Sequence, residues 1–183
     1  MSYCELHCCS AFSFLRGGSF PEQLAEVAAE LEMPAIALLD RNGVYGAQRF
    51  SVAAREHGVR PIIGAELSME DGSILPVLVE NRTGYKNLCG LLTQAHLRSE
   101  KGNCAVRWDD LAEFAQGLVA LFGSGSARAQ LLIDAFGPDN VFVELQRHFI
   151  RGEERINREL IDLARAHRLP LVATNGVQYA KPY

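Results

Sequence analysis

Two residues near the start of the chain, His7 and Cys9, have the types and the spacing of a metal-binding pair. In an extended strand, side chains at positions i and i+2 point to the same face. An imidazole nitrogen and a thiolate sulfur are both common ligands of zinc and other transition metals. The pair therefore indicates a metal site or the remnant of one.

Further polar residues stand at the ends of other apolar segments along the chain. In parallel α/β folds the carboxyl ends of the strands meet at one edge of the sheet, where the chemistry is usually carried out. The additional candidates are Asp40, Glu66, Ser124, Glu144, His148, Asn175 and Gln178. For any one of them a structural role is the simpler interpretation, such as capping a helix or pairing with an arginine. Taken together, the residues favour a site that is functional or that derives from a functional one.

Apolar and helical segments alternate from one end of the chain to the other, as in a mainly parallel α/β sheet or barrel. We expect strands at 3–7, 35–39, 60–67, 74–79, 118–122, 141–145 and 169–173. We expect helices at 21–32, 44–57, 84–97, 108–116, 127–136 and 153–167. This order predicts a TIM-like barrel with irregularities, and an open doubly wound sheet is the alternative.

The composition is that of an ordinary globular protein, with 48% hydrophobic and 22% charged residues among 183. The chain is long enough for one domain with a sizeable core, or for two small domains. We expect a cytoplasmic protein with five free cysteines, because neither a signal peptide nor a membrane-spanning apolar run is evident. The net charge of -4 gives no general basis for binding DNA, which would need a local patch or another part of a larger protein.

Several motifs, taken in order, resemble the N-terminal PHP (polymerase and histidinol phosphatase) domain of bacterial DNA polymerase III alpha-type subunits. Glu-Leu-His-Cys followed by Phe-Ser-Phe-Leu-Arg-Gly is most similar to the error-prone polymerases of replication and damage-response repair. The matching segments are 3–17, 39–46, 62–66, 87–93, 144–148 and 173–179. The resemblance implies a distorted seven-stranded β/α barrel, with residues 1–183 forming one domain of a larger polymerase.

The resemblance also implies a metal centre that this chain has largely lost. In active family members about three ions, usually zinc, manganese or iron, support phosphoester hydrolysis, including 3'–5' exonuclease activity. At the positions of family ligands this chain has Cys9, Arg16, Arg41, Ser124, Gly176 and Gln178. Only His7 and Glu66 clearly remain, with Cys9 as a possible thiolate ligand and Asp40 beside the site.

These losses predict a degenerate site without metal. Two or three scattered ligands do not hold a cluster of cations. The guanidinium groups of Arg16 and Arg41 would add positive charge, and a like-charge contact at about 4 Å costs roughly 4 kcal/mol at intermediate effective dielectric. We expect both groups to replace the metals electrostatically and to pair with Glu66 and Asp40.

The sequence therefore predicts a structural or partner-binding domain. It would pack against the polymerase core of the same chain and against mutagenesis accessory proteins, while DNA and magnesium are bound by the parent protein. One alternative is an active phosphoesterase or 3'–5' exonuclease that uses His7, Cys9, Asp40 and Glu66 with one zinc or manganese ion. The other is an anion-binding module in which Arg16 and Arg41 hold phosphate.

Overall fold

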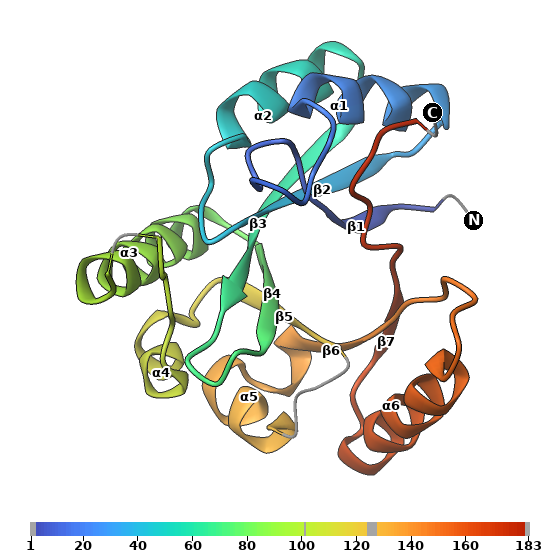
Figure 1. The fold of residues 1–183 in the computed structure, drawn as a ribbon. Coiled ribbons are helices and arrows are strands. Elements are labelled where there is room, and N and C mark those ends of the chain that lie inside the picture. The colour runs from blue at the N-terminus through green and yellow to red at the C-terminus, as the bar shows by residue number, and fades with distance from the viewer. Residues whose placement is uncertain (1–2, 101, 124–127, 182–183) are drawn as a thin grey trace.

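The computed structural model describes residues 3–100, 102–123 and 128–181. Within them one curled sheet has its strands in sequence order: β1 (Glu5–Cys8), β2 (Ala35–Arg41), β3 (Arg60–Ser68), β4 (Ile74–Val79), β5 (Leu118–Phe122), β6 (Val141–Leu145) and β7 (Leu171–Ala173). The helices surround the sheet (Figure 1): α1 (Pro21–Glu30), α2 (Ala47–Glu56), α3 (Arg82–Arg98), α4 (Leu111–Phe114), α5 (Ala129–Phe136) and α6 (Glu153–His167). The α/β class and the positions of all seven predicted strands are confirmed.

The sheet is mixed, because β4 runs antiparallel to both β3 and β5. The other four strand pairings are parallel, as the sequence predicts. The exception follows from the short connection between β3 and β4, where Met69 N–H donates to the Ser73 carbonyl at 2.9 Å. Gly72 supplies the positive φ of 82° that this turn needs. A connection this short joins only antiparallel neighbours.

The two ends of the sheet meet beyond β7. Val177 forms a parallel bridge with Cys8, and backbone hydrogen bonds of 2.9 Å join Val177 to His7 and Cys9. An open doubly wound sheet would reverse its strand order at a switch point, whereas this order is sequential. The structure therefore defines a curled seven-stranded mixed sheet whose ends touch near the carboxyl end of β1.

The inner face of the curl changes from apolar to polar along the parallel strands. Ala37, Leu39, Leu78 and Leu121 form a buried apolar layer inside the curl. Because inward and outward positions alternate along a strand, the polar residues that follow this layer face the same interior. The curl is therefore a packed core with a polar end, as in small barrels.

Two larger apolar layers attach the helices to the outer face. Leu24 and Phe50 join α1 and α2 to the first strands, and the layer that contains Leu88, Leu132 and Leu160 joins α3, α5 and α6 to the rest. The helix predicted at 108–116 is shorter, a 3₁₀ turn at Trp108–Asp110 followed by α4. None of the helices in the described part of the chain is long and apolar enough to cross a membrane.

Candidate functional site at the carboxyl ends of the strands

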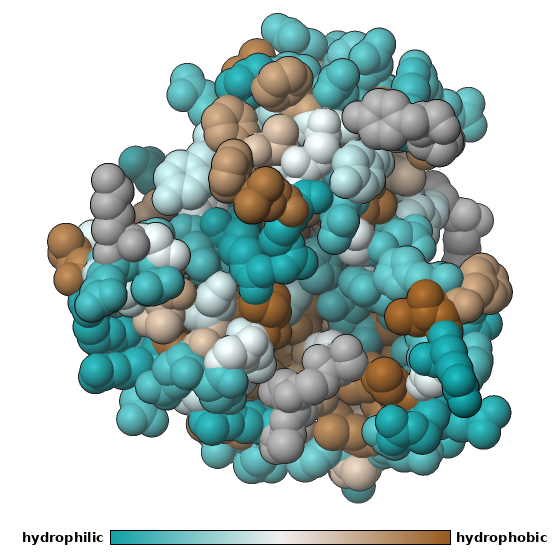
Figure 2. Space-filling model, in the orientation of Figure 1, coloured by the Kyte–Doolittle hydropathy of each residue, from teal (hydrophilic) through white to brown (hydrophobic). Residues whose placement is uncertain are grey.

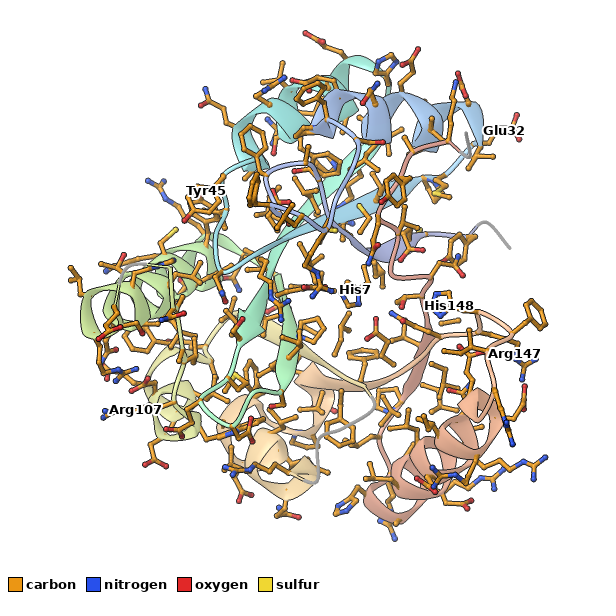
Figure 3. The ribbon with its side chains drawn as sticks, in the orientation of Figure 1. His7, Glu32, Tyr45, Arg107, Arg147 and His148 are labelled. Carbon is orange, nitrogen blue, oxygen red and sulfur yellow. The ribbon has the colours of Figure 1, made fainter. Side chains whose placement is uncertain are left out.

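His7 lies at the centre of the curled sheet between two buried carboxylates (Figure 3). Its Nε2 is 2.9 Å from Glu66 Oε1, and its Nδ1 is 2.7 Å from Glu144 Oε1. An ionised carboxylate only accepts hydrogen bonds, so two ionised partners require both ring nitrogens to donate, which is the imidazolium form. The arrangement ties β1 to β3 and β6 through a buried triplet of charges.

The pKa shifts of these three residues agree with their geometry. Burial lowers the pKa of His7, but its hydrogen bonds with Glu144 and Glu66 outweigh burial and raise the pKa to about 10. Burial is the largest single effect and raises the pKa of each glutamate, but the hydrogen bond and the charge of His7, together with further neighbours, more than offset it, so both values lie below the ordinary one. Each net shift favours the charged form.

The free energy of unfolding is expected to fall on both sides of a maximum in mildly acidic solution. Because the folded pKa of His7 is about 10 against an ordinary 6.5, its contribution is full below about pH 6.5 and is lost as the pH rises through 10. Glu66 and Glu144 have lowered pKa values, so their contribution is present above about pH 4.5 and is lost on acidification.

Urea unfolding of the wild type and of His7→Gln between pH 5 and 9 measures this effect. The variant should lose much of the decline in stability between about pH 6.5 and 9. Equal slopes for the two proteins would mean that His7 is not held as a cation.

Two guanidinium groups lie near Glu66. Arg16 Nη2 is 3.8 Å and Arg41 Nε is 4.0 Å from Glu66 Oε2, which are ion-pair distances too long for hydrogen bonds. Within the described structure, Arg16 Nε and Glu66 Oε2 are buried without hydrogen-bond partners. His7 and the two arginines thus place three groups that can carry positive charge around Glu66.

Asp40 does not pair with either arginine, contrary to the expectation from the sequence. Its buried carboxylate accepts hydrogen bonds from the Ser10 N–H and hydroxyl, both at 2.9 Å, and from the Ser13 hydroxyl at 2.8 Å. The Gly46 N–H, just before α2, donates to it at 3.3 Å. Neutral donors therefore satisfy this carboxylate, and Asp40 anchors the loop 10–18.

Cys9 lies beside the site as a thiol. Burial, together with the negative charges of Glu66 and Asp40, raises its pKa to about 11. This environment therefore favours the neutral thiol. Cys8 packs in the wall of the sheet, where its Sγ donates to the Ala37 carbonyl at 2.8 Å.

The remaining predicted site residues lie at the rim. A ring nitrogen of His148 is 2.8 Å from the Asn175 carbonyl, and its other ring nitrogen is 3.3 Å from Glu153. Asn175 and Gln178 are exposed and line a pocket that also contains His7 and His148. Ser124 lies outside the described residues.

The sequence analysis missed two supports of the site. The Thr174 hydroxyl donates to Glu144 Oε1 at 2.6 Å. Glu5 is buried and accepts backbone hydrogen bonds from His7 at 2.8 Å and from Asn175 at 3.0 Å. A signal for Glu5 was available, because it stands two residues before His7 in the same strand.

The contacts of His7 with Glu66 and Glu144 are shorter than the spacing between two ligands of one metal ion. Two ligands of one tetrahedral zinc, each about 2.0–2.1 Å from it, are about 3.3 Å apart, so the shorter spacings around His7 are those of hydrogen bonds. In the ranges that the structure describes, no group of three or more His, Cys, Asp or Glu side chains could hold an ion.

Comparisons with known proteins agree with this fold. The model of the PHP domain matches residues 5–148, so the chain belongs to the PHP domain family. The chain is similar to the error-prone DNA polymerase of Mycobacterium tuberculosis, with 39% identity over 210 residues, covering 100% of this chain and 19% of that protein. It is 37% identical over 180 residues to the error-prone DNA polymerase of Pseudomonas fluorescens, covering 96% of this chain and 17% of that protein. The chain thus spans about a fifth of the length of these relatives.

Solved structures share the fold at low sequence identity. An amidohydrolase from Chromobacterium violaceum, solved with bound sulfate and no metal, has a TM-score of 0.68 and 14% identity, covering 96% of this chain and 87% of its own. A lesion-specific endonuclease from Pyrococcus furiosus has a TM-score of 0.63 and 13% identity, covering 98% of this chain and 49% of its own. At such identities the likeness concerns the fold alone.

Proposed function

We propose that this chain is the PHP domain of an error-prone DNA-directed DNA polymerase, in which an ion-pair network has replaced the metal centre. The observation that carries the proposal is the position of His7, whose two ring nitrogens each lie within hydrogen-bond distance of a buried carboxylate. Arg16 and Arg41 add positive charge beside Glu66, where active family members would hold cations. The domain has a structural role and no catalytic residue of its own.

We further infer that the curled sheet is a distorted PHP-type β/α barrel and that residues 1–183 form a single domain. The bridge between Cys8 and Val177 supports closure of the barrel. The domain would pack on the polymerase core of the same chain and on mutagenesis accessory proteins. The core would hold the magnesium and the DNA of polymerisation during damage repair in the cytoplasm.

Metal analysis of the purified protein, combined with hydrolysis assays, tests the proposed function. We expect far less than one zinc, manganese or iron ion per chain and no turnover of single-stranded DNA or of a phosphomonoester. Any trace hydrolysis should persist in His7→Ala and therefore reflect contamination. Stoichiometric metal, with turnover that His7→Ala abolishes, would instead establish the metal-dependent phosphoesterase or exonuclease.

A second candidate function, phosphate binding, is favoured by the unused donors of Arg16. Its Nε is buried without a partner in the described structure, and a pocket of about 770 Å³ opens beside it and His148. A guanidinium group suits the oxygens of a phosphate. Calorimetric titration with inorganic phosphate should then give binding that Arg16→Gln weakens and that Arg147→Gln, an exposed control, leaves unchanged.

A further inference from the structure

The loop 10–18 presents two large apolar side chains to solvent. Phe14 is 84% and Leu15 90% exposed, and Tyr45, on the segment after β2, is 61% exposed. Figure 2 shows apolar side chains gathered on the upper part of the face seen there, above its hydrophilic centre. Exposed apolar side chains that lie together in this way are typical of interaction surfaces.

The loop that carries these side chains is rigidly built. Asp40 holds it through Ser10 and Ser13, and the N–H groups of Arg16 and Gly17 donate to the Ser13 carbonyl at 2.9 and 3.0 Å. A β-carbon on Gly17 would lie 2.0 Å from the Ser10 carbonyl oxygen, so the turn requires glycine there. The outward position of Phe14 and Leu15 is therefore a defined conformation.

Leu15 adopts a backbone conformation that leucine disfavours. Its φ is 60°, in the left-handed region where glycine fits without strain. Its side chain is almost wholly exposed, so it gives the domain little packing in return for this strain. The side chain of Leu15 is thus unexplained by the fold of the domain itself.

The nearby aromatic residues Phe12 and Phe20 differ from Phe14 because their rings contact another side chain of the domain. The guanidinium group of Arg49 stacks on Phe12 at 5.6 Å and on Phe20 at 5.4 Å from the ring centroids. The same group donates to Glu22 at 2.5 and 3.0 Å. Phe12 and Phe20 therefore contribute to the domain, whereas Phe14 has no such stacking partner among the contacts described.

We propose that Phe14 and Leu15, together with the exposed Tyr45 on the segment after β2, form a docking surface that inserts into an apolar depression on the remainder of the polymerase chain. This inference rests on the proposed function and names the contact through which the domain would pack on the polymerase core. Three such side chains offer about 400–500 Å², whereas an independent partner needs roughly 800 Å² on each side. A covalently linked partner needs less, because tethering gives it a high effective concentration.

The relatives support a tethered partner over a second copy of the domain. The matched region forms only 17–19% of the error-prone polymerases, so in those proteins most of the chain is available to cover it. The protein form to examine is therefore the intact polymerase that carries this sequence.

Hydroxyl-radical footprinting of the intact polymerase tests the docking surface directly. Phe14 and Leu15 should be oxidised at least about tenfold more slowly than their exposure in the isolated domain predicts. The reference side chain is Leu97 on α3, which is 84% exposed and should be oxidised at the rate of an exposed leucine. Oxidation of Leu15 at the rate of Leu97 would overturn the inference. Protection that arises from self-association of the domain would also overturn it, because the occupant would then be a second copy.

Leu15→Gly separates docking from folding. Glycine suits the positive φ, so the thermal midpoint should stay the same or rise. Loss of the docked side chain should weaken the docking equilibrium about tenfold or more and raise the oxidation of Phe14 in the intact polymerase. Leu97→Ala should change neither quantity. An unaltered Phe14 footprint in Leu15→Gly would exclude this docking mode, even if the metal analysis upholds the proposed function.

Discussion

Replacing His7 with alanine is expected to lower the free energy of unfolding by about 3–5 kcal/mol at neutral pH. The change removes the only group that hydrogen-bonds to both Glu66 and Glu144 in the described structure, and these side chains are only 7% and 5% exposed. Glu66 would keep the two arginines at 3.8 and 4.0 Å, which are too far for hydrogen bonds, and Glu144 would keep the Thr174 hydroxyl. Two buried carboxylates would thus lose their shared cation, which is costlier than losing one neutral hydrogen bond. Urea denaturation at pH 7 measures the difference.

His57→Ala is the matched control for this experiment. His57 is exposed at the end of α2, so its replacement should change stability by less than about 0.5 kcal/mol. Adding Glu66→Gln and Glu144→Gln to His7→Ala should recover part of the loss, because the buried charges are then removed together. A His7→Ala protein as stable as His57→Ala would show that the charge triplet is not formed.

Asp40→Ala is expected to cost about 3 kcal/mol, because it leaves several buried donors of Ser10, Ser13 and Gly46 without an acceptor. The loop 10–18 should loosen at the same time, since Asp40 is its anchor. Chemical denaturation gives the first effect, and amide exchange of the Ser10 N–H gives the second.

Two further substitutions make the Asp40 result specific. Asp40→Asn keeps one acceptor oxygen and should cost less than Asp40→Ala, while the exposed Asp139→Ala should be nearly neutral. If loop 10–18 exchanged at the wild-type rate in Asp40→Ala, the hydrogen bonds to Asp40 would not be what holds it.

The strands could be predicted because each is a short apolar run, and the polar residues after those runs marked the end of the sheet that carries the site. The direction of β4 was not predicted, although the turn at Asp71 and Gly72 was a hairpin signal. This turn indicates a hairpin only when the short spacing between β3 and β4 is taken into account. The strand–helix alternation along the rest of the chain favoured a parallel pairing instead.

The partners of the buried charges could not be predicted from sequence. Glu144 is 137 positions from His7, so their contact depends on how far the sheet curls. Asp40 and Glu66 are both carboxylates near the carboxyl ends of strands, yet one faces serine hydroxyls and the other faces His7 and the arginines. Sequence shows which residues gather at one end, whereas the register and inward direction of each side chain decide which of them meet.

The protonation state of His7 is the most direct test of whether an ion-pair network has replaced the metal centre. In ¹⁵N-labelled protein at pH 8, both ring nitrogens of His7 should have the chemical shifts of an imidazolium. One equivalent of zinc should leave the His7 signals unchanged. A neutral His7 with one nitrogen shifted by bound zinc would contradict the proposal and restore a metal site at this position.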